Sequence, residues 1–275
     1  MLRFGLFVLF FIASAISFAD EPLQFGVLNQ RSILLTAEIW NPILQYVSAK
    51  SGVPLMLKMG KTAQETTAMT VRGEFDFIYT NHLFTPERDK LHYYPIARFD
   101  TPGIRAQIVT LADSPYRTLA DLQGRRVAFP TPDGFAGYRL PMDALLKAGV
   151  KVQPIFTGNQ EAAMSRMQYG HVAAVGVNSA LMASYAQRES LKYRVLYSSR
   201  LYLDLPIMVN PRVPAEQVRK VREALLGMAH DSAGRQILQV ASSLLNSKQV
   251  LGFVGVDDRD YENYRQFYRT ALVKE

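Results

Sequence analysis

The chain has 275 residues, no cysteine and a formal net charge of +7. The absence of cysteine excludes disulfides and every metal site or nucleophile built on a thiolate. The basic residues are scattered, without basic runs or aromatic–basic repeats, so nucleic acid is not expected as a partner. A mild positive charge instead favours anionic small molecules or a membrane surface.

Residues 1–19 have the composition of a secretory signal peptide. One early arginine precedes an apolar run over residues 4–16, and the small residues Ser17 and Ala19 occupy the −3 and −1 places of a cleavage site before Asp20. The alternative, a membrane anchor, would need a run of about 20 apolar residues. We therefore expect cleavage after Ala19 and a mature protein in the periplasm.

Short apolar strands alternate with amphipathic helices in the first part of the mature chain. The pattern predicts strands at residues 23–28, 53–58 and 75–79, with helices at 36–50 and 63–72 between them. Such a βαβαβ order predicts a parallel sheet with helices on both faces.

A second α/β series follows two apolar strands at residues 94–99 and 105–111, which a Thr-Pro-Gly turn separates. The last part of the chain is expected to be helical. The elements predicted from residue 126 onward are strands at 126–129, 152–156, 172–177, 193–197 and 206–209, and helices at 137–148, 160–169, 178–188, 214–229, 232–243 and 258–272.

Two α/β series of similar size predict an α/β protein of two lobes. We expect lobe 1 to comprise residues 20–103 and 202–275, and lobe 2 residues 104–201, with two hinge crossings between them. In open α/β sheets the ligand site lies at the carboxyl ends of the strands. Two such sheets facing each other across a hinge form a cleft that can close on a ligand.

Five segments of the chain carry a resemblance to a known family through their order and spacing. They read LQFGVLNQ, IWNPILQYVSAKSGVPL, VRGEFDFIYTN, DSPYRTLADLQGRRVAFPTPDGFAGYRLPMDALLKAGV and LYSSRLYLDLPIMVNPRVP. The chain resembles the phosphate/phosphonate-type periplasmic solute-binding proteins of ABC importers, over nearly all of its mature length. The resemblance implies a type II periplasmic binding protein fold (a Venus flytrap), a small-molecule ligand between the lobes, and an ABC permease as partner.

The loop at residues 129–141 departs from the family pattern. A helix N-terminus suits an anion, and the resemblance implies a Ser-Thr-Ser sequence whose hydroxyls hold phosphoryl oxygens. Gly134, Phe135 and Ala136 occupy those places, while Gln160 and Ala173 replace a histidine and an aspartate. We expect this loop to bind through backbone amides and the Phe135 ring, and to hold compact phosphonates weakly. The alternative is that Phe135 packs inward.

Polar side chains follow several of the predicted strands. Arg31 can pair with a carboxylate or phosphoryl group, or can be a solvated loop residue. Asn178 and Ser179 offer hydrogen-bond donors or cap the next helix. Asp204 can bind an amine of the ligand or be part of a turn. Trp40 is expected in the core. The ligand-binding residues predicted are Asn29, Gln30, Arg31, Tyr79, Thr80, Asn81, Thr131, Gly134, Phe135, Ala136, Gly137, Tyr138, Gln160, Asn178, Ser179 and Asp204.

The sequence contains no catalytic constellation, because the GFAG segment lacks the serine of a nucleophile elbow. The histidines, His82 among them, lack zinc-ligand spacing, so no metal or cofactor is expected. A monomeric solute receptor for an ABC importer is the leading hypothesis. The alternative is a periplasmic sensing module that docks on a membrane signalling protein such as a histidine kinase or a diguanylate cyclase.

Overall fold

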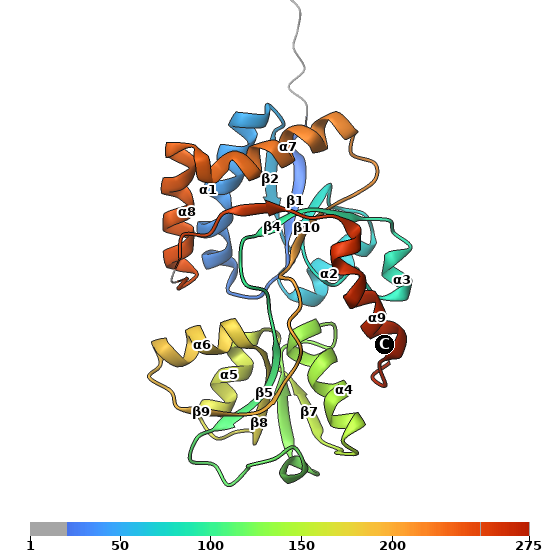
Figure 1. Cartoon of the computed structure of the whole chain (residues 1–275), viewed down its shortest axis with the longest axis vertical. Coiled ribbons are helices and arrows are strands. Elements are labelled where there is room, and N and C mark those ends of the chain that lie inside the picture. The colour runs from blue at the N-terminus through green and yellow to red at the C-terminus, as the bar shows by residue number, and fades with distance from the viewer. Residues whose placement is uncertain (1–20, 248, 275) are drawn as a thin grey trace, which may run out of the picture.

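The computed structural model describes residues 21–247 and 249–274. The chain forms two α/β lobes, each built around its own sheet and joined by extended segments (Figure 1). The predicted signal peptide lies outside the described residues. Within them, no helix is long and apolar enough to cross a membrane.

Lobe 1 contains a six-stranded sheet in the order β11-β4-β10-β3-β1-β2. Strand β1 pairs in parallel with both β2 and β3, as the βαβαβ pattern predicted. Strand β10 is antiparallel to β3 and β4, and β11 is antiparallel to β4. The strands are β1 (Leu23–Val27), β2 (Leu55–Lys58), β3 (Phe77–Tyr79), β4 (Tyr94–Phe99), β10 (Pro206–Val209) and β11 (Phe253–Gly255).

Lobe 2 contains a five-stranded sheet in the order β7-β6-β8-β5-β9. Strand β6 pairs in parallel with β7 and β8, whereas β5 is antiparallel to β8 and β9. Both sheets are therefore mixed, which corrects the expectation of a parallel sheet in lobe 1. Strands β10 and β5, which the chain enters directly from a hinge crossing, run against the βαβ series, and so does β11. The strands are β5 (Ala106–Leu111), β6 (Arg126–Phe129), β7 (Gln153–Phe156), β8 (Ala174–Asn178) and β9 (Tyr193–Ser198).

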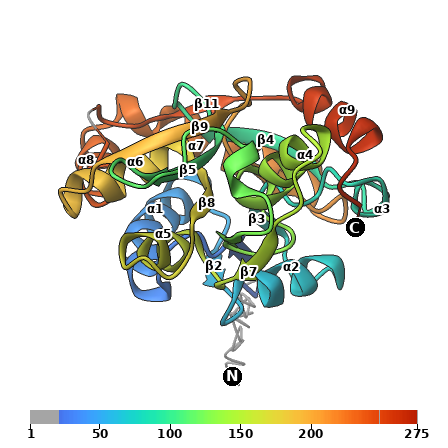
Figure 2. The same ribbon diagram turned by 90° about the horizontal axis from the view of Figure 1, so that it is seen from below.

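The helices cover the faces of the two sheets. Two views agree that α6 and α8 lie on one flank of the molecule and that α4 and α9 lie on the other (Figures 1 and 2). The helices are α1 (Ile33–Ser51), α2 (Ala63–Val71), α3 (Pro86–Asp89), α4 (Leu140–Lys147), α5 (Gln160–Gln168), α6 (Ser179–Arg188), α7 (Ala215–Gly227), α8 (Ser232–Leu244) and α9 (Glu262–Thr270), with single turns at Ala120–Leu122, Met228–His230 and Asp258–Tyr261 and a π-helical turn at Phe135–Arg139.

Local sequence explains the limits of the longest helix. Ser32 caps the start of α1, where its side chain accepts a hydrogen bond from the Leu35 amide at 3.3 Å. Gly52 ends the helix in the left-handed region, at φ 70°, which a glycine adopts without strain. Trp40, near the middle of α1, is 3% exposed and packs against Phe25, as expected for a core residue.

The two hinge segments run side by side. Ile104, on the outgoing segment, forms an antiparallel bridge with Tyr202 on the returning one. Gly103 has φ +101°, and a Cβ there would collide with the carbonyl oxygen of Tyr202. The close approach of the two segments at this point therefore requires glycine.

The C-terminal residues depart from the expected lobe division. Residues 202–275 were all expected in lobe 1, yet the end of the chain packs on lobe 2. The amide of Leu272 donates to Asp143 Oδ1 at 2.7 Å, and Arg139 Nη1 donates to the carbonyl oxygen of Lys274 at 2.7 Å. Val273 packs against the apolar cores of both lobes. We call residues 271–274 the C-terminal strap, because they form a third link between the lobes.

Candidate functional site

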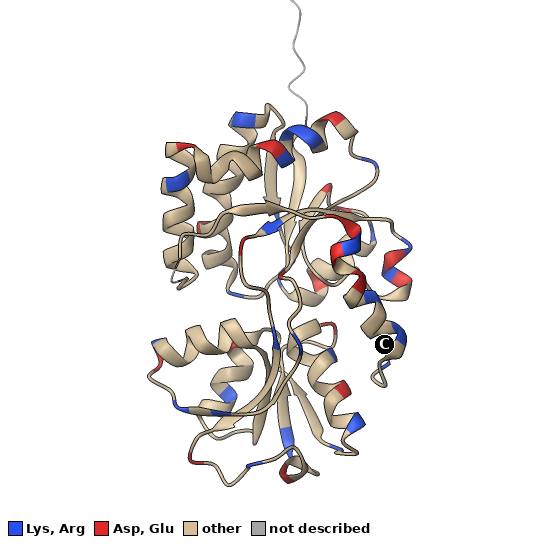
Figure 3. Ribbon diagram, in the orientation of Figure 1, with Lys and Arg blue, Asp and Glu red and all other residues tan. Residues whose placement is uncertain are grey.

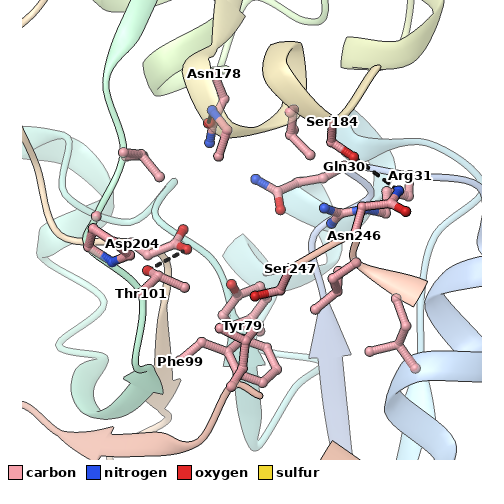
Figure 4. Close-up of a pocket in the computed structure, with 18 of the residues that line it drawn as sticks. Gln30, Arg31, Tyr79, Phe99, Thr101, Asn178, Ser184, Asp204, Asn246 and Ser247 are labelled. Carbon is pink, nitrogen blue, oxygen red and sulfur yellow. Dashed lines mark hydrogen bonds between the residues drawn. The ribbon is translucent and has the colours of Figure 1, made fainter. Parts of the chain in front are cut away.

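A cavity of about 660 Å³ lies between the lobes, beside the hinge (Figure 4). Its walls come from the first helix and strand ends of lobe 1, from the hinge segments, from α6 of lobe 2, and from the loop that follows α8. The lining residues with polar side chains include Gln30, Arg31, Thr36, Tyr79, Asp100, Thr101, Asn178, Ser184, Gln187, Asp204, Asn246, Ser247 and Gln249.

Arg31 provides the positive charge of the cavity. Its side chain follows β1 and is half-buried, and none of the residues that the structure describes forms an ion pair or hydrogen bond with it. Burial lowers the pKa of the guanidinium, while Tyr79 and Asp204 oppose that shift. An arginine remains protonated under such conditions. A half-buried guanidinium with free donors is suited to bind an anionic group.

Asp204 provides a negative charge on the opposite side of the cavity from Arg31 (Figure 4). Its carboxylate accepts hydrogen bonds from Thr101 Oγ1 at 3.0 Å and from the Leu205 amide at 2.8 Å. Burial raises the pKa of this carboxyl group, although those hydrogen bonds oppose the shift. The two charges do not form an ion pair, so each remains available for a separate group of a bound molecule.

The floor of the cavity is aromatic. The Trp40 ring lies 4.9 Å from the Tyr79 ring and 5.5 Å from the Phe99 ring, measured between centroids. All three side chains line the cavity while most of their surface is buried in lobe 1. This packing fixes the rings in place, so they present a preformed apolar surface between the two charges.

The charged residues of the described chain are of both signs in each lobe. In the view of Figure 3, basic and acidic positions are interspersed along the ribbon of both lobes. Inside the cavity, by contrast, one positive and one negative side chain lie apart from each other.

Comparison with known proteins identifies the family. A family model for the periplasmic phosphonate substrate-binding proteins of ABC transporters matches residues 25–261. The chain belongs to this family. Its members capture solutes for ABC transporters and are not enzymes, so the resemblance read from the sequence and the non-enzymatic role are both confirmed. A search of the curated proteins found no match.

Solved structures share the fold at low sequence identity. A binding protein of a phosphonate transporter from Pseudomonas aeruginosa has a TM-score of 0.75 and 18% identity, over 90% of this chain and 85% of that one. A Prochlorococcus marinus protein in complex with methylphosphonate has a TM-score of 0.76 and 15% identity, over 90% and 97%. The aliphatic sulphonate binding protein of Escherichia coli has a TM-score of 0.59 and 16% identity, over 94% and 95%. These similarities confirm the type II fold.

The loop at residues 134–137, which was expected to bind the ligand, packs against the C-terminal helix. The ring of Phe135 is 1% exposed and stacks on Tyr264 of α9 with centroids 4.1 Å apart. Tyr202 and Phe267 contact its edges at 4.9 and 5.3 Å. This packing contradicts the expectation that the ring is a ligand-contacting surface, because the ring belongs to an aromatic cluster with the C-terminal helix.

The space next to that loop is small. A hollow of about 30 Å³, far smaller than the cavity beside the hinge, lies beside Gly134 and Ala136. Its lining includes seven other residues of the predicted site, namely Asn29, Gln30, Asn81, Thr131, Phe135, Gln160 and Asn178. Of the predicted residues, Arg31, Tyr79 and Asp204 line only the large cavity, and Gln30 and Asn178 border both spaces. Four line neither space, namely Thr80, Gly137, Tyr138 and Ser179.

Several predicted residues have structural partners that account for them. Asn29 donates to the Gly60 carbonyl oxygen at 2.9 Å and accepts from Thr66 Oγ1 at 2.6 Å. Thr80 Oγ1 accepts from the His82 amide at 3.1 Å, and Ser179 Oγ accepts from the Arg105 amide at 3.3 Å. These side chains hold the loops around the site.

Three further predicted residues are explained by packing or capping. Tyr138 packs against Phe129 and Phe156 in lobe 2 with centroids 5.1 and 5.0 Å apart. Gly137 has no room for a side chain, because a Cβ would collide with Pro130. Asn178 caps α6 through the Ala180 amide at 2.9 Å, as the alternative proposed, and also lines the large cavity.

The sequence did not identify the part of the cavity wall that comes from α6 and from the loop after α8. Asn246 Nδ2 donates to Ser184 Oγ at 3.0 Å and so joins lobe 1 to lobe 2 at the cavity (Figure 4). No strand end marks these positions, so the rule that places ligands after strands could not find them.

His82 makes the stability of the protein depend on pH. The ring is 4% exposed, with Nδ1 3.0 Å from Thr67 Oγ1, and burial lowers its pKa to about 4. An unfolded histidine has a pKa near 6.5, so the unfolded chain binds a proton that the folded protein excludes. The resulting contribution is fully present above about pH 6.5 and decreases as the pH falls toward 4.

We therefore expect the free energy of unfolding to fall by about 2 kcal/mol between pH 6.5 and pH 5, at about 1.4 kcal/mol per pH unit. Urea denaturation at each pH measures this change. In His82→Gln the same interval should produce a much smaller decrease, whereas His92→Gln, a substitution at an exposed position, should leave the slope as in the wild type. Equal slopes in the wild type and His82→Gln would contradict the assignment.

Proposed function

We propose that this periplasmic substrate-binding protein captures a small anionic or zwitterionic solute in the cavity between its lobes and delivers it to an ABC permease. Arg31 would hold the anionic group and Asp204 a cationic group where the solute carries one. The observation that carries the proposal is the half-buried Arg31 side chain, which faces the cavity without a partner among the described residues. A buried cation of this kind gains most when a bound anion replaces its lost water.

The altered loop supports a ligand other than a compact phosphonate. Side-chain hydroxyls that hold phosphoryl oxygens contribute about 1.5–3 kcal/mol each when they bond to a charged group. Gly134, Phe135 and Ala136 supply none of these side-chain bonds, and the hollow beside them is far smaller than the cavity that Arg31 lines. Alkylphosphonates are therefore expected to bind weakly, in contrast to their place in the family's name.

A thermal-shift screen of the mature protein tests the proposal. Carboxylates, sulfonates, phosphonates and amino acids should be tested, each at a concentration well above the dissociation constant sought. A ligand at about 100 times its dissociation constant adds about 2.7 kcal/mol, which raises the melting temperature of a protein of this size by several degrees. A cationic or neutral solute that binds with submicromolar affinity, and needs no anionic group, would contradict the proposal.

A further inference from the structure

The cavity is much larger than a phosphonate headgroup requires. Pockets of roughly 300–1,000 Å³ hold drug-sized ligands, and this cavity measures about 660 Å³. A solute of a few non-hydrogen atoms would leave most of that volume filled with water against an aromatic floor. The volume of the cavity therefore indicates how large the uncharged part of the solute is.

The lobes already contact each other on both flanks of the molecule. On one flank, Asn246 of lobe 1 donates to Ser184 of lobe 2 at 3.0 Å. On the other, Arg88 of lobe 1 pairs with Asp133 of lobe 2 at 2.9 Å, and the C-terminal strap joins Leu272 to Asp143. Because packed interfaces resist further compression, the volume is that of the joined arrangement and not of a widely open cleft.

Part of the wall between the two charges is apolar, and the polar side chains of Gln30 and Ser247 line the rest of it. Trp40, Tyr79 and Phe99 form the floor on the lobe 1 side. Facing them, α6 contributes the small side chains of Ala180 and Ala183, which leave the space open. Arg31 and Asp204 lie at opposite sides of this apolar section (Figure 4). A molecule that fills the cavity must therefore carry its charge at an end and present an apolar middle to these walls.

We infer that the solute has an apolar body of about 10–20 non-hydrogen atoms, aromatic or long-chain, with an anionic group at one end. This inference rests on the proposed function, since it places the solute in the same cavity. Each methylene that such a body buries should increase the affinity about fourfold. The chemical class is an aryl or long-chain organic acid or amino acid, and not a compact oxyanion.

The dye 8-anilinonaphthalene-1-sulfonate is a suitable probe, because it joins a sulfonate to an apolar body of about twenty non-hydrogen atoms. Fluorescence titration of the mature protein should show one site of micromolar affinity with a blue-shifted emission. Ala183→Phe, which places a ring in the cavity from an exposed helical position, should weaken the dye at least tenfold. Ala233→Phe, the same change at an exposed position of α8 outside the cavity lining, should leave the affinity within twofold.

Three results would overturn the inference. One is the absence of dye binding to the wild type. A second is an equal affinity of the wild type and Ala183→Phe for the dye. The third is displacement of the dye by micromolar methylphosphonate, which would show that a compact oxyanion satisfies the cavity.

Arg31→Gln separates this inference from the proposed function. If Arg31→Gln binds the dye as well as the wild type does, while Ala183→Phe binds it more weakly, the apolar body is supported and Arg31 is rejected as the anion contact.

Discussion

Replacing Phe135 with alanine is expected to reduce the free energy of unfolding by about 3–5 kcal/mol, the range found when buried phenylalanines are truncated. The ring is 1% exposed and contacts four aromatic side chains, among them Tyr264 at 4.1 Å. Removing it leaves a void between the loop at residues 134–137 and α9, because rings held by other packing cannot collapse fully into the gap. Urea denaturation of the mature protein measures the loss.

Phe156→Ala is the matched control. That side chain belongs to the same lobe but is 43% exposed, so its removal should cost much less, about 1 kcal/mol or below. Equal losses in the two variants would show that the Phe135 cluster has no special weight. Conversely, an unchanged stability of Phe135→Ala together with a weakened ligand would restore the view of this ring as a ligand contact.

Arg31→Gln should weaken the binding of an anionic solute from the screen by a factor of about 30 to 4,000. The substitution removes the charge that faces the cavity and leaves a desolvated anion without its partner, an effect of about 2–5 kcal/mol at buried charge pairs, and each 1.4 kcal/mol is tenfold. Isothermal titration calorimetry of wild type and variant gives the ratio. The melting temperature of the free protein should change little, since Arg31 has no partner among the described residues.

Arg126→Gln controls for net charge. Arg126 is exposed at the start of β6, outside the lining of the large cavity, and the substitution changes the total charge by the same amount. Its effect on affinity should stay within twofold at physiological salt, where distant surface charges are screened. If Arg126→Gln weakened the solute as much as Arg31→Gln, a general electrostatic attraction and not a direct contact would explain the binding.

Much of the fold could be predicted because its elements are locally encoded. The periodicity of apolar residues located strands such as β4 and β6 and helices such as α5, since burial of one face imposes that spacing. The direction of β5 and β10, the strands that the chain enters from a hinge crossing, was not predictable in the same way. Strand direction there depends on the path that the chain takes between the lobes. The local pattern of apolar residues contains no information about that path.

The site was predictable to the extent that it lies after strands. Arg31 follows β1, and Tyr79 is the last residue of β3. Side chains at these positions reach the carboxyl edge of the sheet. The role of Phe135 was not predictable, because its partners Tyr264 and Phe267 are about 130 residues away in sequence. Asn246 was also missed. An asparagine just after a helix is common because it helps to end the helix, so its contact with Ser184 was not visible in the sequence.

The C-terminal strap has a consequence for how the opening of this receptor could be observed. Helix α9 is anchored to lobe 1, where Arg265 pairs with Asp89 at 2.9 Å, while the strap after it is bound to lobe 2. A rotation about the hinge must therefore carry α9 with lobe 2 or release the strap. In the second case the Leu272 amide loses its acceptor, Asp143, and becomes open to exchange with solvent deuterium. The exchange rate of that single amide would then report how often the two lobes part, and the solute would slow it.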